Sequence, residues 1–276
     1  MLFPTLEEVR RLSENYRMIP VFWEIPADHW SPLQVFAAMS QGEEHAFLLE
    51  SISTPQAPWQ RWSYIGWNSP FGAPVQELAD LPAVSPFFPE KPELSGGFLR
   101  MQDGQCRMFT EMAAYDHMHS TLIIMVNLYT GTDIAAQYQA AEIRAAEIAS
   151  KIEGVRLKPQ YRDDEPPIEV QPSGGMTSVT NAPDSFELYR RLRSSRPAPY
   201  LYYIKADGAY EMGAADSPDA GGTVGFYANH GMQKLCTPVV SVRYAENRAE
   251  IRSADPQETE QVLALMRSAK LENHDA

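Results

Sequence analysis

The chain has 276 residues, 44% of them hydrophobic, and its 23 Lys and Arg against 36 Asp and Glu give a formal net charge of -13. This length can bury a substantial core, while the negative charge argues against nucleic acid or an anionic membrane as a partner. Two cysteines are too few for a disulfide framework. The N-terminus lacks the pattern of a signal peptide, and no apolar run reaches about 18 residues. We therefore expect a cytoplasmic protein.

The first part of the chain predicts strands with helices between them. Leu6, Val9 and Leu12 are spaced as on one face of a helix over residues 5–16. Residues 18–28 predict a short strand, which its prolines confine to a sheet edge or the approach to one. The remaining elements are, in chain order, a helix that starts at Ser31 and Pro32 and runs to Met39, strands over 45–51 and 59–67, a long loop over 68–98, one long or two short strands over 106–129, and a helix over 134–152.

The second part of the chain predicts mostly strands. Residues 158–177 contain paired prolines and the sequence PSGG, which makes them the best candidate for a linker. Beyond them we expect a helix over 185–196, a hairpin that turns at Asp207 and Gly208, three strands over 221–254, and a last helix from Pro256 to about Leu271. Strands in series with few helices predict an α+β fold of antiparallel sheets with flanking helices. We expect one compact domain over 1–276, whose two halves are joined by that linker.

The stretch AFLLES, residues 46–51, ends an apolar strand in a carboxylate and a hydroxyl. From the residues alone, the simplest interpretation is that Glu50 and Ser51 end the strand and cap a turn. The alternative is that the strand carries them inward to meet a ligand. Arg61 lies beside Trp59 and Trp62, where its guanidinium could stack on an aromatic ring.

Several segments, in this order, resemble component I of anthranilate synthase, in the chorismate-utilising enzyme family. Together they are more specific than any one motif, and they cover most of the chain. They are residues 16–39, 46–51, 61–67, 113–128, 137–152, 186–204 and 222–243. The resemblance implies a reduced form of that family's fold.

The resemblance also identifies what this chain lacks. Where Ala220 alone joins residues 212–219 to residues 221–225, the family has a long catalytic stretch with an acidic metal-binding segment and a His-bearing strand. Thr259 stands where the family has a metal-ligand glutamate. The conversion of chorismate to anthranilate needs bound magnesium and positioned acid and base groups. We therefore expect no catalytic residues, no magnesium or other cofactor, and no enzymatic activity.

The retained segments correspond to the feedback site at which the family binds L-tryptophan. The resemblance places in that site Leu49, Glu50, Ser51, Arg61, Pro199, Tyr200, Leu201, Val224, Gly225, Phe226 and Cys236. Residues of these types suit a zwitterion with an indole ring. Glu50 can pair with the ammonium, Arg61 can donate to the carboxylate, and apolar and aromatic walls from both halves of the chain can hold the ring. We therefore expect a non-catalytic protein that binds L-tryptophan.

The loss of a catalytic half would expose surface that is interior in the family. We therefore expect a homo-oligomer or a partner enzyme of aromatic amino-acid metabolism, regulated through tryptophan. Two other functions remain open: an enzyme with altered activity on chorismate or a related acid, and a docking subunit for a glutamine amidotransferase. His117 and His119 lie two apart, which on a strand is compatible with zinc, but no second pair of ligands accompanies them.

Overall fold

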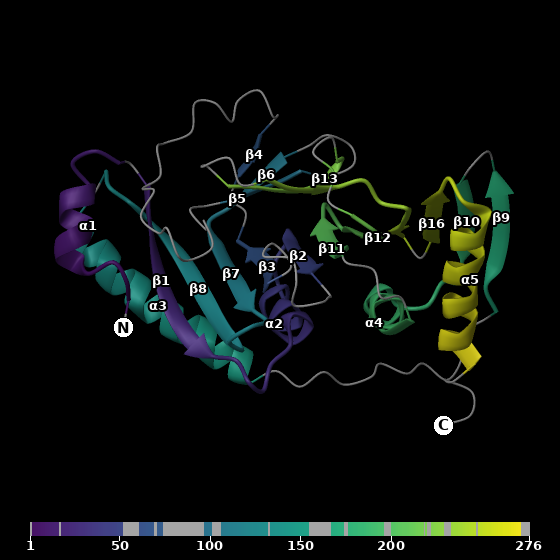
Figure 1. Cartoon of the computed structure of the whole chain (residues 1–276), viewed down its shortest axis with the longest axis horizontal. Coiled ribbons are helices and arrows are strands. Elements are labelled where there is room, and N and C mark those ends of the chain that lie inside the picture. Colours follow the sequence, from purple (N-terminus) through teal and green to yellow (C-terminus); the bar gives the residue numbers. More distant parts are fainter. Residues whose placement is uncertain are drawn as a thin grey trace.

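The protein is represented by a computed structural model. It describes residues 2–16, 18–51, 61–68, 71–73, 97–100, 106–131, 133–154, 167–173, 176–195, 200–217, 219, 222–228, 233–246 and 248–271. In these ranges the chain forms two antiparallel sheets and a layer of helices (Figure 1). The expected α+β class with antiparallel sheets is therefore confirmed.

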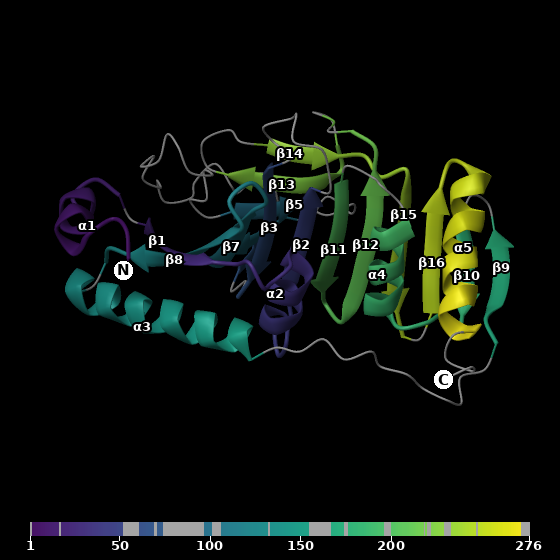
Figure 2. The ribbon, with the colours of Figure 1, turned by 60° about the horizontal axis from the view of Figure 1, so that its bottom comes forward.

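A sheet of eleven strands runs through both halves of the chain (Figure 2). In sheet order its strands are β1 (Met18–Pro26), β8 (Thr121–Tyr129), β7 (Glu111–Asp116), β3 (Trp62–Trp67), β2 (Ala46–Ser51), β11 (Tyr200–Ala206), β12 (Ala209–Ala215), β15 (Val240–Ala245), β16 (Arg248–Ser253), β10 (Met176–Thr180) and β9 (Glu169–Ser173). The two edge strands both contain proline, which cannot donate to a further strand. The predicted edge position of residues 18–28 is confirmed by β1.

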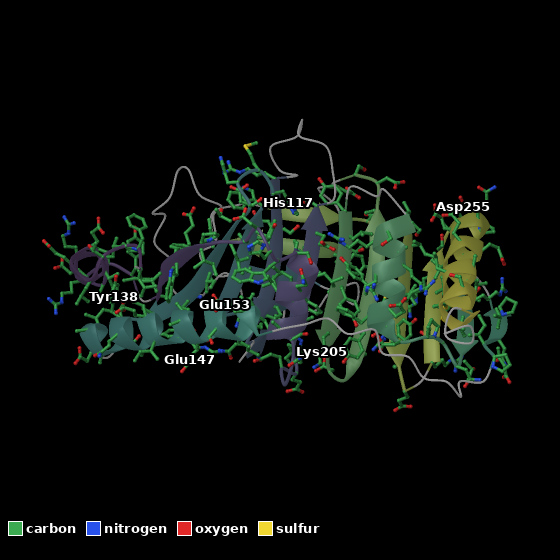
Figure 3. The ribbon with its side chains drawn as sticks, turned by 90° about the horizontal axis from the view of Figure 1, so that it is seen from below. His117, Tyr138, Glu147, Glu153, Lys205 and Asp255 are labelled. Atoms are coloured by element: carbon green, nitrogen blue, oxygen red, sulfur yellow. The ribbon has the colours of Figure 1, made fainter. Side chains whose placement is uncertain are left out.

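Helices cover one face of this large sheet, as the view from below in Figure 3 shows. They are α1 (Leu6–Leu12), α2 (Pro32–Met39), α3 (Ile134–Glu153), α4 (Ser185–Ser195) and α5 (Pro256–Leu271). Each helix buries apolar side chains in one common cluster with the sheet, among them Val9, Phe36, Ile148, Leu188 and Met266. We call this side of the large sheet the helix face.

A smaller sheet packs on the opposite face of the large sheet. Its strands, in order, are β14 (Gln233–Cys236), β13 (Val224–Ala228), β5 (Gly97–Arg100), β6 (Cys106–Phe109) and β4 (Phe71–Ala73). A second apolar cluster lies between the two sheets, where the rings of Phe47 and Phe109 meet edge to face with centroids 4.7 Å apart. We call this side of the large sheet the small-sheet face.

Local sequence signals account for several element ends. Ser31 caps α2, because its hydroxyl accepts from the Gln34 amide at 3.3 Å while the Gln34 side chain accepts from the Ser31 amide at 2.7 Å. The hairpin of β11 and β12 turns at Asp207 and Gly208, whose φ angles of 51° and 74° suit those residue types. Pro256 opens α5 as expected.

Three expectations about the sheets were wrong. Residues 106–129 form three strands, because the chain passes from the small to the large sheet at Thr110, whose hydroxyl donates to the Asn68 carbonyl at 2.9 Å. Residues 222–253 contain four strands, since β13 and β14 belong to the small sheet and β15 and β16 to the large one. The expected loop over 68–98 contains β4 at residues 71–73.

Part of the expected linker over 158–177 is sheet. Strands β9 and β10 pair with each other, and β10 also pairs with β16. The glycine pair of the PSGG sequence stands between these two paired strands in the chain. Glycine is common both in hairpin turns and in linkers, so the sequence did not distinguish the two. Residues 155–166 lie outside the described ranges. Of the described helices, α3 is the longest at 20 residues, and neither it nor any other is apolar enough to cross a membrane.

Gly213 in β12 is a position where the sheet requires glycine. A Cβ added there would lie 2.6 Å from the Tyr202 hydroxyl and 2.6 Å from the backbone oxygen of Val240. We expect Gly213→Ala to lower the free energy of unfolding by about 1–3 kcal/mol, because a strand backbone must move. Urea denaturation measures this. The control is Gly131→Ala, where nothing lies within 4 Å of the added atom; equal costs for both variants would refute the explanation.

Candidate functional site

The residues expected to bind a ligand meet where β2 pairs with β11. Ser51 lies opposite Tyr200 in this ladder, and Glu50 lies opposite Leu201. Successive side chains on a strand point to opposite faces of the sheet. The ladder therefore divides the expected residues into two groups, one on the helix face and one on the small-sheet face.

The small-sheet face brings together most of the expected residues that the structure describes. Tyr200, Val224 and Cys236 lie in the apolar cluster between the sheets, and Leu49 packs against it. Ser51 is on the same face by alternation and is buried, and its amide donates to the Ser63 hydroxyl at 3.3 Å. These five residues come from β2, β11, β13 and β14, which are strands from both halves of the chain.

The remaining expected residues of this group are described in part. Gly225 and Phe226 lie on β13, where they pair with Leu235 and Lys234 of β14. The side chain of Phe226 and all of Pro199 lie outside the described part of the chain.

Cys236 is a buried thiol in this cluster. Burial, and next the negative charge of Asp219, raise the pKa of Cys236 to about 12. The thiol is therefore protonated at neutral pH and does not act as a nucleophile. Burial, with a smaller contribution from Cys236, likewise raises the pKa of Tyr200. The cluster is thus a buried, uncharged and apolar group of side chains at neutral pH, and the Asp219 carboxylate is close enough to act on Cys236.

Glu50 points away from this cluster, toward the helix face. Its carboxylate accepts from the Tyr189 hydroxyl at 2.7 Å and from Arg193 Nε at 3.0 and 3.1 Å, both from α4. Burial raises the pKa of Glu50, and the charge of Arg193 and the bond from Tyr189 offset part of that rise. Alternation gives Glu50 and Ser51 to different faces of the sheet, and the Glu50 carboxylate already has donors, so this geometry does not favour the expected pairing of Glu50 with a ligand's ammonium. Leu201 also lies in the helix-face cluster.

Arg61 is held by Asp116, near the end of β7. Its Nε donates to Asp116 Oδ1 at 2.8 Å, Nη2 bonds Oδ2, and the guanidinium lies over the Trp62 ring, 4.7 Å from its centroid. Burial of Asp116 opposes its ionisation, but bonds from Arg61, His119 and the Met118 amide outweigh burial and lower the pKa of Asp116 to about 2. The expected stacking of Arg61 on tryptophan is confirmed, whereas a ligand carboxylate would have to share the guanidinium with Asp116.

The two histidines of this region do not form a zinc pair. They follow the last residue of β7, in a turn, so the expected strand alternation does not apply to them; Figure 3 labels His117. His117 Nε2 lies 2.7 Å from the Ser63 hydroxyl, whereas His119 Nδ1 lies 2.8 Å from Asp116 Oδ2. Each imidazole thus has its own partner.

Sequence reasoning did not identify the partners of Glu50. Tyr189 and Arg193 are four residues apart on α4 and therefore lie on one face of it. Leu188 and Leu192 mark that helix as amphipathic, and they are buried against the sheet. This spacing showed which face of α4 is buried, but not which strand residue it would meet.

We expect Glu50→Ala to lower the free energy of unfolding by about 2–4 kcal/mol, because it leaves the buried Tyr189 hydroxyl without an acceptor and Arg193 without a counter-charge. Glu50→Gln keeps an acceptor and is neutral, which burial favours, so its cost should be smaller. Urea denaturation at pH 7 compares the two. Equal stability of Glu50→Ala and the unaltered chain would contradict this account of how α4 is held.

Asp116 should make stability depend on pH in the acid range. Because its pKa is about 2 in the fold against an ordinary 3.8, its contribution is present above about pH 4 and is lost as the pH falls toward 2. We expect Asp116→Asn to remove about 2 kcal/mol at pH 7 and correspondingly less at pH 3. Unfolding at both pH values tests this, with Glu153→Gln at the exposed end of α3 as control. A cost that is the same at both pH values would contradict the assignment.

The comparisons with known proteins agree with the motifs. The chain is 26% identical over 298 residues to anthranilate synthase component 1 of Acetivibrio thermocellus, covering 78% of this chain and 59% of the relative. It is 23% identical to the probable anthranilate synthase component 1 of Schizosaccharomyces pombe, covering 78% and 56%. A stretch of 67 residues is 40% identical to the Aquifex aeolicus protein of the same name, covering 24% and 13%. No family model matches the sequence.

A solved structure has a similar fold. The menaquinone-specific isochorismate synthase MenF from Escherichia coli superposes with a TM-score of 0.60 at 9% identity, covering 96% of this chain and 98% of that chain. The resemblance to anthranilate synthase component 1 is thus confirmed as distant homology. The chain spans a little over half the length of the first two relatives.

Proposed function

We propose that this chain, a distant homologue of anthranilate synthase component 1 among the chorismate-utilising enzymes, is a non-catalytic protein that binds L-tryptophan. The supporting observation is the cluster between the two sheets. Leu49, Ser51, Tyr200, Val224 and Cys236 come from four strands and meet on one face of the large sheet. They are five of the residues that the resemblance assigns to the tryptophan feedback site.

The chemistry of the cluster suits the indole part of the ligand. Tyr200, Val224 and Leu49 are apolar or aromatic side chains. Transfer of the ligand's indole ring from water to such side chains is favourable. The thiol of Cys236 is uncharged, so it is compatible with an indole ring beside it. An apolar surface with a few polar groups at its border is the usual composition of a small-molecule site.

The polar end of the ligand needs partners other than Glu50. Asp219 is held by the Thr237 hydroxyl at 2.6 Å and is close enough to Cys236 to raise the pKa of that thiol. We assign to Asp219 the interaction with the ammonium that the sequence had given to Glu50. Arg61 remains the candidate donor to the ligand carboxylate, in competition with Asp116.

The absence of catalysis is part of the proposal. The order of the motifs supports this part of the proposal. Between residues 212–219 and 221–225 this chain has only Ala220, whereas the family that it resembles has a long catalytic stretch there. A protein that keeps a ligand site without turnover would regulate a second molecule, either another copy of itself or an enzyme of aromatic amino-acid metabolism.

Calorimetric titration of the full chain with L-tryptophan tests the proposal. We expect saturable binding of L-tryptophan, none of D-tryptophan, and at least a tenfold weaker dissociation constant in Ser51→Ala and Asp219→Asn. Ser194→Ala, on the exposed side of α4, is the matched control and should bind as the unaltered chain does. Chorismate with magnesium and a nitrogen donor should give no anthranilate.

Three outcomes would count against the proposal. No tryptophan binding by a folded chain would mean that the feedback motif is a relic. Turnover of chorismate that stops when magnesium is removed would show an enzyme. If the chain binds a glutamine amidotransferase tightly and tryptophan does not change that binding, the chain is a docking subunit.

A further inference from the structure

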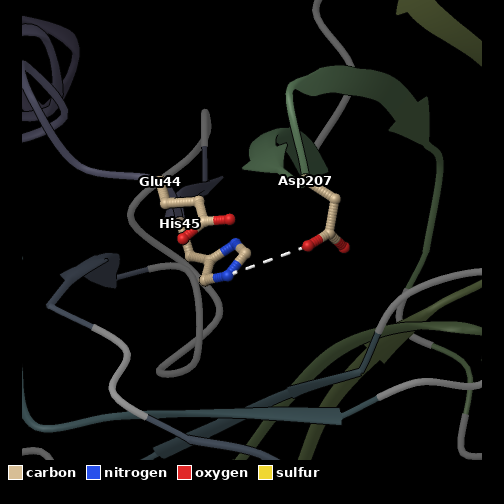
Figure 4. Close-up of side chains that lie close together, drawn as sticks. All are labelled: Glu44, His45 and Asp207. Atoms are coloured by element: carbon tan, nitrogen blue, oxygen red, sulfur yellow. Dashed lines mark ion pairs between the residues drawn. The ribbon is translucent and has the colours of Figure 1, made fainter.

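A second group of side chains lies at the opposite end of β2 from the cluster between the sheets. Glu44 and His45 immediately precede β2, and Asp207 lies in the turn between β11 and β12. The pairing of Ala46 with Lys205 brings that turn beside the start of β2. Figure 4 shows the His45 imidazole beside the Glu44 carboxylate and facing Asp207.

The three side chains are close enough to share one ion. One potential ligand atom from each lies within 4.8 Å of the other two. His45 Nε2 is 3.9 Å from Asp207 Oδ1, too far for a hydrogen bond. Ligand atoms around a tetrahedral zinc ion are separated by about 3.3 Å, given metal–ligand distances near 2.0 Å. The exposed Glu44 and Asp207 can close this difference by small side-chain movements.

The environment of His45 is evidence for a bound ligand. It is 92% buried, its relative exposure being 8%, and its Nδ1 has no hydrogen-bond partner. A buried imidazole nitrogen without a partner is unusual, because desolvation is costly unless a bond replaces water. Burial first, and next the charge of Arg107, lower the pKa of His45. Metals bind the neutral imidazole, and a lowered pKa favours that form.

Arg107 of β6 orients the carboxylate of Asp207. Its Nη2 donates to Asp207 Oδ2 at 2.5 Å, while the other oxygen, Oδ1, faces His45. A hydrogen bond of this kind to a ligating carboxylate is the usual outer support of a metal site. The positive charge of Arg107 lowers the affinity for a cation, and the two carboxylates offset it.

We propose that Glu44, His45 and Asp207 form a binding site for a divalent transition metal ion of the zinc type. One imidazole nitrogen and two carboxylate oxygens form a ligand set that suits zinc, manganese or iron better than magnesium or calcium, which prefer oxygen alone. The site uses none of the residues proposed for tryptophan binding. An ion there would fasten the β11–β12 turn to the start of β2.

Titration of the full chain, without an affinity tag, with zinc chloride tests the site. We expect one saturable site, and a dissociation constant at least tenfold weaker in Glu44→Gln and in Asp207→Asn. Both residues are exposed, and asparagine tolerates the positive φ of position 207, so both variants should fold. His29→Gln, an exposed histidine outside the group, is the matched control and should bind zinc unchanged.

Nitrogen-15 NMR of the histidine rings tests the role of His45 in the unaltered chain. Zinc at one equivalent should shift the ring nitrogen signals of His45 and leave those of His29 in place. Magnesium at the same concentration should shift neither. Zinc binding that is equal in all the variants, or that leaves the His45 signals unmoved, would overturn the proposal, as would the absence of a saturable site.

Discussion

The pairing of β2 with β11 is the interaction on which the rest of the structure depends. It joins residues 46–51 to residues 200–205 and so makes one sheet from two distant parts of the chain. Its register also decides which side chains share a face, because a shift of one residue would exchange the faces of the whole strand. Ser51 and Tyr200 thereby meet on the small-sheet face, while Glu50 turns to α4.

Glu50 shows how one strand serves two purposes. Its carboxylate is buried on the helix face and bonded to two residues of α4, and this ties that helix to the middle of the large sheet. A buried charge of this kind needs all its partners, since losing one leaves the others desolvated and unpaired. The next residue, Ser51, faces the apolar cluster, so this one strand contributes buried polar groups to both faces of the large sheet.

The two proposed sites lie at opposite ends of β2. The strand has six residues, so at a rise of about 3.3 Å per residue its first and last residues are about 17 Å apart. Tyr200 and Asp207 lie at the two ends of β11 in the same way. Both sites thus depend on the same ladder, yet they use different side chains, and a substitution in one need not disturb the other.

Neighbouring residues specify the local elements: the cap at Ser31, the turn at Asp207 and Gly208, and the edge strand over 18–26. The order of the motifs along the chain indicates the distant homology. The alternation of side chains along a strand also follows from the sequence, and it places the adjacent residues Glu50 and Ser51 on opposite faces of the sheet. The bonds of Tyr189 and Arg193 to Glu50, and the approach of His45 to Asp207, become visible in the folded chain alone. Those contacts join residues far apart in the chain, and their partners depend on strand order and register, which no local pattern specifies.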